Sequence, residues 1–466
     1  MTKILLGYLM FNKVRYGLLL LLIALVSGCT DITNIDDDGE SSSNGLDSRL
    51  QKLAGQMGTD NLQSIKEPPE AKAELGRMLY HDKLLSGTKD VSCATCHNLK
   101  HQTTDGQSLS IGVDGQGEGP DRIMADANAR NPRNATIVIN RGLPEYHAIL
   151  SDSRIAKTKS GFISPLGDDL PEGLDNMLAV QALTPVIDRG EMLGEQGSED
   201  VFGEPNEIAM VEDDNSPEVW RRLMLRLMEI PEYVQLFKEA YPNVPEEELS
   251  FVHAANALAA FQISALTFTD SPWDQYLEGN QEALSRKAKR GGLLFFGKAK
   301  CAQCHNGPLL SDQEHHNIAV PQIGPGKGEA APLDLGRYHV TNQEIDQFKF
   351  RTPPLRNVAI TGPWMHNGAY TNLKDAIKHH LDPEHALTNY DVTQLAPDIQ
   401  ETYLGSDDIK SKLLETLDPA LITPTRLTEK EVNEITAFLN SLTTPEAQNL
   451  SSVIPDSVPS GLPVDD

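Results

Sequence analysis

Basic residues are scarce in this chain of 466 residues, which has 40 Lys and Arg against 67 Asp and Glu. The formal net charge of −27 argues against nucleic acid and anionic lipid surfaces as partners. We interpret the acidity as a source of solubility, with a docking surface for a basic partner protein as the alternative. Hydrophobic residues make up 39% of the chain, so we expect a globular core rather than wholesale disorder.

Long apolar runs are also lacking, because the run at 18–26 has about ten residues and is too short to span a bilayer. It follows two basic residues and ends in Leu25-Val26-Ser27-Gly28-Cys29. This ending resembles the lipobox of bacterial lipoproteins, in which the Cys is acylated and becomes the mature N-terminus. An ordinary signal peptide is the alternative. We therefore expect a signal peptide over 1–28 and a lipid anchor at Cys29, the only membrane contact. By the same resemblance, the protein faces the periplasm, and Thr30 favours the outer membrane.

Strict alternation of apolar and polar residues, the pattern of a half-buried strand, forms no long run. Apolar spacing instead predicts helices over three segments, 71–79, 219–241 and 251–266. Thr428 and Glu431 form a capping box, which predicts that another helix starts there. Segments 103–170 and 306–365 are rich in Gly, Pro, Asn and Asp and predict long loops. The predicted fold class is mainly α.

Four of the five cysteines lie in two copies of one motif, Cys-x-x-Cys-His, at 93–97 and 301–305. This motif is the attachment signal for c-type haem, in which the thiols add to the porphyrin and the His becomes the proximal iron ligand. A redox disulfide or half a zinc site would not need the two histidines. We predict two covalent haems, attached through Cys93, Cys96, Cys301 and Cys304, with His97 and His305 on the irons.

The residues before the two motifs also repeat. Leu75-Gly76-Arg77-Met78-Leu79-Tyr80 precedes the first motif, and Arg290-Gly291-Gly292-Leu293-Leu294-Phe295-Phe296 precedes the second. Such a repeat predicts two similar domains with one haem each. The predicted boundaries are a tether over 29–60, an N-terminal haem domain over 61–268, a C-terminal haem domain over 269–445 and an extended tail over 446–466.

Further motifs follow in order along the chain: Gln181–Pro185, Glu191-Met192, Asp274–Leu277, Arg351–Asn357 and Met365–Gly368. With both haem motifs, they make the chain resemble the bacterial di-haem cytochrome c peroxidases and their relative MauG, from about residue 70 to 442. The resemblance implies two cytochrome c-like helical domains with long loops. It also implies that the N-terminal haem reacts with peroxide, while the C-terminal haem takes electrons from a small carrier.

Peroxide cleavage needs a group that moves a proton from one peroxide oxygen to the other, and a carboxylate can do this. By resemblance, Glu191 is the catalytic Glu, Gln181 lies ten positions before it as in the family, and Pro185 is a pocket-wall residue. Two features depart from the family. The Gly-His-Gly stretch, whose His blocks the peroxidatic iron until reduction, is replaced by Ser110-Ile111-Gly112-Val113-Asp114-Gly115, and the Trp between the haems is missing from Leu150–Arg154.

The second axial ligand of the His305 haem is Met in most family peroxidases and Tyr in MauG, and the matching position here is His380. Helical spacing supports His380 over His379, because His380 falls on the apolar face that begins at Leu373. Two imidazoles would hold this haem at a lower potential than His and Met. By resemblance, a calcium ion lies between the haems, bound by Asn134, Thr361 and Pro363, since calcium takes oxygen ligands.

The predicted function is that of a cytochrome-c peroxidase. It would reduce hydrogen peroxide to water with electrons from a periplasmic cytochrome c or cupredoxin. One alternative is MauG-like oxidation of side chains on a partner protein, against which the missing Trp and His380 argue modestly. The other alternative is a non-catalytic electron carrier or redox sensor, against which Glu191 beside an open iron position argues. A homodimer is an alternative to a monomer.

Overall fold

Short α-helices and long loops make up the part of the chain described by this computed structural model, residues 43–124 and 130–465. The α-helices are α1 (Ser43–Gln56), α2 (Glu70–His81), α3 (Cys93–Cys96), α4 (Met177–Ala182), α5 (Ser216–Met228), α6 (Pro231–Ala240), α7 (Phe251–Ala265), α8 (Pro272–Leu277), α9 (Arg286–Phe296), α10 (Tyr338–Thr341), α11 (Leu373–Leu381), α12 (Pro383–Thr388), α13 (Pro397–Gln400), α14 (Asp407–Glu415) and α15 (Glu429–Asn440). The mainly α fold class predicted from the sequence is confirmed.

The strands are only two to four residues long and pair antiparallel. They are β1 (Gly115–Gln116), β2 (Ile123–Met124), β3 (Ala148–Ile149), β4 (Ile155–Thr158), β5 (Gly161–Ile163), β6 (His315–His316) and β7 (Phe350–Arg351). The β3–β4–β5 sheet follows the loop of the first haem motif, and β6 pairs with β7. These strands shape loops and make no layer of their own.

The helix before the first haem motif packs on the last helix of the N-terminal half. A Cβ on Gly76 of α2 would lie 1.9 Å from the carbonyl oxygen of Ala257 in α7, so only glycine permits this crossing. Leu75 and Leu79 of α2 are fully buried in the same apolar cluster as Phe261. The close contact lets the two helices bury their apolar faces together.

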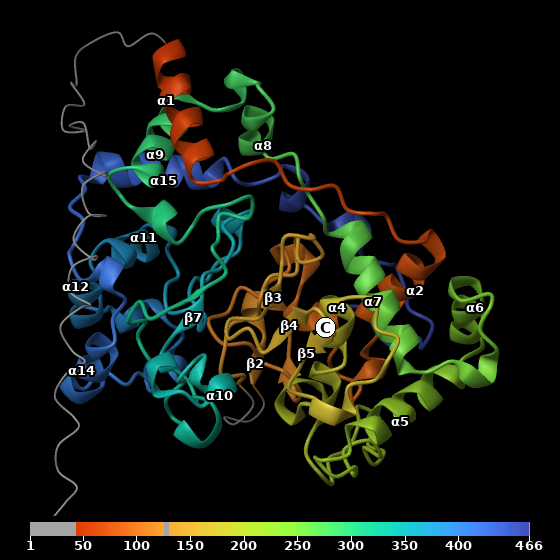
Figure 1. The fold of residues 1–466 in the computed structure, drawn as a ribbon. Helices are drawn as coiled ribbons and strands as arrows, with labels where there is room; N and C mark the ends of the chain where they lie inside the picture. Colours follow the sequence, from red (N-terminus) through yellow and green to blue (C-terminus); the bar gives the residue numbers. More distant parts are fainter. Residues whose placement is uncertain (1–42, 125–129, 466) are drawn as a thin grey trace, which may run out of the picture. The chain divides into compact units, whose positions relative to one another are not determined.

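The C-terminal half repeats this helix pair, as the sequence repeat predicts. Gly291 of α9 meets the backbone of α15, where an added Cβ would lie 1.9 Å from the carbonyl oxygen of Glu434. Phe295 and Phe438 fill the cluster between these helices. Helices α1, α9, α11 and α15 gather in one part of Figure 1, whereas α2, α5, α6 and α7 gather in another. Each repeated glycine therefore marks one helix crossing, and each crossing supports one haem motif.

Helix boundaries agree with the sequence predictions except at one point. The helix predicted over 219–241 is two helices, α5 and α6, which are separated at Pro231. Proline disfavours helical backbone at the residue before it, and Ile230 is accordingly extended. The capping box at α15 is present, with the Thr428 backbone N–H donating to the Glu431 carboxylate at 2.7 Å.

The segment before the first haem domain differs from the predicted tether, and the tail over 446–466 packs against the N-terminal half. Within the tether predicted over 29–60, Ser43–Gln56 form α1, whose Leu50 and Ala54 are fully buried in the C-terminal cluster. Within the tail predicted over 446–466, Leu450 packs into the N-terminal cluster. Polar composition suggested a solvated tether, but the leucines and the alanine of α1 provide apolar surface that docks this helix. The domain boundaries themselves remain a prediction.

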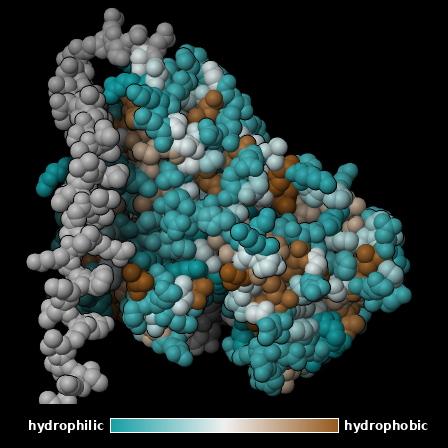
Figure 2. Space-filling model, in the orientation of Figure 1, coloured by the Kyte–Doolittle hydropathy of each residue, from teal (hydrophilic) through white to brown (hydrophobic). Residues whose placement is uncertain are grey.

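The face of the molecule in Figure 2 is mostly hydrophilic, with apolar residues in small separate patches. This agrees with the acidic composition of the chain. No helix within 43–124 and 130–465 is both long enough and apolar enough to cross a membrane. The predicted signal peptide and the lipid anchor at Cys29 lie outside the described residues.

Candidate functional site

The first haem motif occupies a short helix with a well-defined start. Ser92 and Thr95 cap α3 reciprocally, and His97 stands at its C-terminal end. The hydroxyl of Tyr80, from α2, donates to the His97 carbonyl at 2.9 Å. This bond ties the motif to the α2–α7 pair, so the thiols of Cys93 and Cys96 and the His97 ring are presented from a rigid base.

The second motif is held in a similar way. Cys301–Gln303 form one 3-10 turn, and the ring of His305 is buried. His305 Nδ1 hydrogen bonds to the Leu310 carbonyl at 3.1 Å. Because a carbonyl only accepts, this nitrogen carries the proton and Nε2 keeps its lone pair for a metal.

The thiols of both motifs suit attachment to haem better than redox chemistry. All four are free and half-buried. Burial raises the pKa of Cys93 and of Cys301 to about 12, so neither is a reactive thiolate at neutral pH. Burial also lowers the pKa of His97 and of His305 to about 4, which keeps both rings in the neutral form that binds metal.

The two histidines at the end of α11 have different surroundings. His379 is fully buried, and both of its ring nitrogens are hydrogen bonded, to the Tyr370 hydroxyl at 2.8 Å and to the Ile318 carbonyl at 2.7 Å. His380 bonds the Ala376 carbonyl through Nδ1 at 2.8 Å. Its ring centroid lies 6.2 Å from that of His305, at 58° between the planes. One metal ion bonded to each ring at about 2 Å fits between them.

Glu191 lies on one turn of π-helix, Arg189–Leu193, which begins at Asp188. The Asp188 carboxylate accepts hydrogen bonds from the backbone N–H groups of Gly190 and Glu191, at 3.0 and 3.1 Å. Burial, followed by the charge of Asp188, raises the pKa of Glu191 to about 7. The charge of Glu191 in turn helps to raise the pKa of Cys96, so the carboxylate acts on the first haem motif. Such a group can exchange a proton near neutral pH.

The other residues predicted around the peroxide site lie on the chain segment that leads to Glu191. Gln181 is the penultimate residue of α4, and Pro185 begins the 3-10 turn that leads to Asp188. Both side chains are half-buried. The structure therefore brings Gln181 and Pro185 onto the segment that carries Glu191.

The loop that departs from the Gly-His-Gly pattern packs directly under this turn. A Cβ on Gly112 would lie 1.9 Å from the Gly190 carbonyl oxygen, and the Cys96 thiol reaches the Ile111 carbonyl at 3.7 Å. Val113 is buried in the apolar cluster that includes Cys93, whereas Asp114 is exposed. Within the stretch 110–115, a buried aliphatic side chain and an exposed carboxylate therefore stand side by side, and neither is a histidine.

The comparisons with known proteins agree with this arrangement. The family model described as di-haem cytochrome c peroxidase matches residues 70–282. Cytochrome c551 peroxidase of Pseudomonas aeruginosa is 31% identical over 311 residues, covering 66% of this chain and 71% of that protein. This chain belongs to the di-haem cytochrome c peroxidase family. Membership accounts for two haem c groups, one at each Cys-x-x-Cys-His motif.

Two further relatives illustrate the range of this peroxidase family. Cytochrome-c peroxidase IdrP1 of Pseudomonas sp. strain SCT is 27% identical over 410 residues, covering 83% of each chain. The crystal structure of a MauG-like protein associated with microbial copper homeostasis has a TM-score of 0.56 at 25% identity, covering 85% of this chain and 96% of that one. The family therefore includes both peroxidases and MauG-like proteins.

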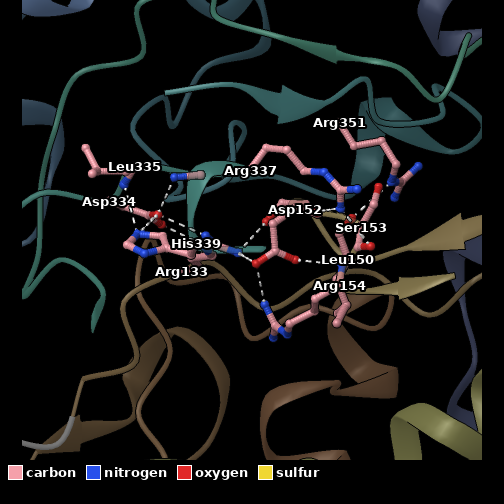
Figure 3. Close-up of polar contacts among 12 residues, drawn as sticks. Arg133, Leu150, Asp152, Ser153, Arg154, Asp334, Leu335, Arg337, His339 and Arg351 are labelled. Atoms are coloured by element: carbon pink, nitrogen blue, oxygen red, sulfur yellow. Dashed lines mark hydrogen bonds and ion pairs between the residues drawn. The ribbon is translucent and has the colours of Figure 1, made fainter. Parts of the chain in front are cut away.

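A network of buried charges occupies the segment where this family member lacks the family Trp (Figure 3). Arg133 lies between the carboxylates of Asp152 and Asp334, at 2.6 Å from each. Arg154 pairs with Asp152 at 2.9 Å, and Arg337 donates to the Asp152 carbonyl at 2.7 Å. The network thus joins residues of the N-terminal half, Arg133 to Arg154, to residues of the C-terminal half.

Charges in and near this network also act on the carboxyl of Glu191. The positive charges of Arg154 and Lys327 oppose the burial that raises the pKa of Glu191. Within the network, the neighbouring arginines lower the pKa of Asp152 far below its ordinary value in spite of burial. Both halves of the chain therefore set the electrostatic environment of Glu191, through residues that reasoning from the sequence missed.

Two aromatic rings beside the network were also missed. The His366 ring is stacked on Phe350, with centroids 3.5 Å apart and 11° between the planes. The Arg133 guanidinium lies 5.5 Å from the centroid of the Phe350 ring. His366 belongs to the Met365–Gly368 motif, which was the only sequence signal for this pair. Burial lowers the pKa of His366 to about 3, so the ring is neutral.

Two of the residues predicted to bind calcium, Asn134 and Thr361, contact backbone carbonyls of loops through their side chains. Asn134 donates its side-chain N–H to the carbonyl of Gln107 at 2.6 Å, which leaves its amide oxygen as a ligand atom. Thr361 is buried, and its hydroxyl contacts the Asn357 carbonyl at 3.4 Å.

A separate acidic cluster, missed in the sequence, holds His316 between Asp312 and Asp418 at 3.1 and 2.7 Å, next to Cys304.

Proposed function

We propose that this chain reduces hydrogen peroxide to water at the His97 haem, with electrons that enter through the His305 haem from a periplasmic cytochrome c or cupredoxin. The observation that carries the proposal is Glu191. Its side chain is half-buried, the loss of solvent raises its pKa to about 7, and its charge acts on the first haem motif. A plain electron carrier would not need a proton-exchanging carboxyl at that place.

Cys93, Cys96 and His97 would hold a haem, which would supply the iron needed for the reduction of peroxide. Glu191, as the carboxylate, takes the proton of the inner peroxide oxygen and returns it to the outer oxygen, which then leaves as water. Gln181, which lies on the segment that leads to Glu191, donates a hydrogen bond that orients peroxide. The aliphatic Val113 excludes water and offers no ligand, so peroxide reaches its site without displacing a histidine.

Residues of the C-terminal half form the site through which electrons enter. His305 and His380 would hold the iron of the second haem, and the hydrogen bond from each Nδ1 to a backbone carbonyl fixes the orientation of the ring. Asn134, Thr361 and Pro363 hold a calcium ion between the halves. The chain faces the periplasm as a lipoprotein anchored through Cys29, preferably in the outer membrane, where an acidic surface suits a basic donor.

A steady-state assay tests the function. Holoprotein that carries both covalent haems is mixed with peroxide and with a prereduced small cytochrome c or cupredoxin. We expect two donor molecules to be oxidised for each peroxide consumed, because the reduction of peroxide to water takes two electrons. If both haems are attached and reducible but no donor is oxidised with peroxide, the proposal is wrong and electron carriage is favoured.

A further inference from the structure

Two buried arginines from opposite halves of the chain have no carboxylate partner. Arg141 belongs to the N-terminal half and is 8% exposed, and Arg351 of β7 is 5% exposed. Among the residues that the structure describes, neither guanidinium forms an ion pair with Asp or Glu. Arg226 and Arg356 are also buried, but each pairs with a carboxylate, at 2.6 and 2.5 Å. We name Arg141 and Arg351 the arginine pair.

The hydrogen bonds of the arginine pair use only part of each guanidinium. Arg141 donates through Nε to the Ile137 carbonyl at 2.8 Å and through Nη1 to the Tyr146 hydroxyl at 3.2 Å. Arg351 donates through Nε to the Leu150 carbonyl at 3.0 Å (Figure 3). The Nη1 atom of Arg351 is buried and has no hydrogen-bond partner. A backbone carbonyl thus orients each guanidinium, and donors remain for a further acceptor.

The two positive charges of the arginine pair act on each other through the protein interior. Burial, followed by the charge of Arg141, lowers the pKa of Arg351 to about 10, so Arg351 is still charged at neutral pH. Asp152 is the carboxylate whose charge opposes this shift, but it already pairs with Arg133 and Arg154. Burying two like charges without an anion of their own is strongly unfavourable. The arginine pair therefore fits a negatively charged ligand.

The arginine pair belongs to the surroundings of the first haem motif. The turn that follows His97 is bonded to the segment of Arg141, because the Val138 N–H donates to the Thr103 hydroxyl at 3.1 Å. The charge of Arg141 helps to lower the pKa of His97. For His305, the charges that shift its pKa come from other residues of the C-terminal half. A ligand of the arginine pair is thus expected beside the first haem motif rather than the second.

The chemistry of a haem supplies the missing anion, since a haem carries two propionate carboxylates besides its iron. A guanidinium presents two parallel N–H groups that match the two oxygens of one carboxylate. Tyr146 is buried, and its hydroxyl accepts from Arg141, so its own proton is available to the same anion. A free inorganic anion is the other source of negative charge, but it would have to reach three buried side chains.

We propose that the arginine pair and the Tyr146 hydroxyl bind a propionate of the haem attached at Cys93 and Cys96. The proposal rests on membership of the di-haem family, which accounts for that haem, and it does not depend on the reduction of peroxide. One carboxylate then neutralises charges from both halves of the chain. Attachment of the first haem therefore also joins the halves, next to the charge network of Figure 3.

The test uses holoprotein produced in cells that are fed aminolevulinate with a heavy carbon isotope in its carboxyl group. Haem synthesis keeps this label only in the propionate carboxyls, so infrared spectra of labelled minus unlabelled protein show these groups alone. We expect the propionate bands to shift in Arg351→Met and in Arg141→Met, because a carboxylate loses a charged donor. Arg226→Met is the matched control, since Arg226 is buried but has its own carboxylate partner, and it should leave the bands unchanged.

The reduction potential of each haem gives a second readout. Positive charge favours reduced iron, so Arg351→Met should lower the potential of the N-terminal haem and leave that of the C-terminal haem unchanged. Arg351→Lys guards against a folding defect, because it keeps the charge but not the planar pair of N–H groups. Its potential should be closer to that of the wild type than the potential of Arg351→Met, and its propionate bands should still shift.

Propionate bands that are the same in the wild type, Arg351→Met and Arg351→Lys would overturn the proposal. Such bands, together with a potential that depends on added chloride or phosphate, would assign the arginine pair to a free anion instead. A shift in the potential of the C-terminal haem alone would overturn the assignment to the first haem. Neither measurement uses peroxide, so shifted bands support the proposal even without turnover, and turnover with unchanged bands leaves only the peroxidase proposal.

Discussion

At the scale of single residues, Glu191 shows how the surroundings of a carboxyl group change its pKa. The neighbouring Glu195 is exposed, whereas Glu191 lies on a π turn and is half-buried. Burial and Asp188 disfavour its charge, while Arg154 and Lys327 favour it, and the balance is a pKa of about 7. The same side chain on the surface would be fully ionised and of little use for proton exchange.

Glu191→Gln should lower the rate of reaction with peroxide by roughly 10²–10⁴-fold, because the amide keeps the shape but cannot shuttle a proton. Stopped-flow absorption measures this rate, and both haem spectra should remain nearly intact. In the wild type, the rate should fall as pH falls through about 7, since the carboxylate that accepts the peroxide proton is lost. This pH dependence should be absent from Glu191→Gln.

Glu195→Gln is the control, because it makes the same change at an exposed position on the neighbouring loop. It should keep both the rate and its pH dependence. Equal rates for Glu191→Gln and the wild type would remove Glu191 from the mechanism.

His380→Met should raise the reduction potential of the C-terminal haem, because a thioether favours reduced iron. Spectroelectrochemical titration of both haems measures this, and the N-terminal haem should be unaffected. His385→Met, at an exposed position on α12, should change neither potential. An unchanged potential in His380→Met would show that another residue is the ligand.

At the scale of elements, the loop 110–115 decides whether the enzyme needs activation. Arg122 fixes this loop by donating to the carbonyls of Ile111 and Gly112, at 3.1 and 2.8 Å. Val113, which is buried in this loop, has no atom that could bind an iron. We therefore expect the oxidised protein to react with peroxide without prior reduction.

Val113→His should give this loop an imidazole that binds the iron of the N-terminal haem and keeps peroxide from it. The oxidised variant should show a low-spin N-terminal haem and should react with peroxide only after reduction, whereas the wild type should show a high-spin signal. Electron paramagnetic resonance and stopped-flow rates measure both effects. Val113→Leu is the matched control, because it fills the space without a ligand. A wild-type protein with both haems low-spin would contradict this prediction.

At the scale of the whole molecule, the charge network of Figure 3 holds the N-terminal and C-terminal halves together. Arg133→Met should lower the free energy of unfolding by about 3–5 kcal/mol, because it leaves the buried Asp152 and Asp334 without their shared partner. Thermal unfolding and limited proteolysis between the halves measure this loss.

Arg221→Met is the control for the network, because Arg221 forms an exposed ion pair with Glu218. The free energy of unfolding should there be nearly unchanged, because solvent screens an exposed ion pair. Equal stability of the two variants would show that the halves are joined mainly by apolar packing.

The sequence by itself determined the local features. Apolar spacing and the capping box located α2, α7 and α15, and the Cys-x-x-Cys-His motifs located both candidate haem sites, because these signals depend on residues close in sequence. Segment 219–241 was predicted as one helix, but Pro231 disfavours helical backbone at Ile230 and divides it into α5 and α6.

The tertiary structure decided whatever joins distant segments. Docking of α1 and of the C-terminal residues depends on apolar surfaces supplied by helices far along the chain. The pKa of Glu191 depends on Arg154 and Lys327, and the Arg133 network depends on Asp334, about two hundred positions away. Burial and charge interactions act through space, so no local pattern of residues encodes them.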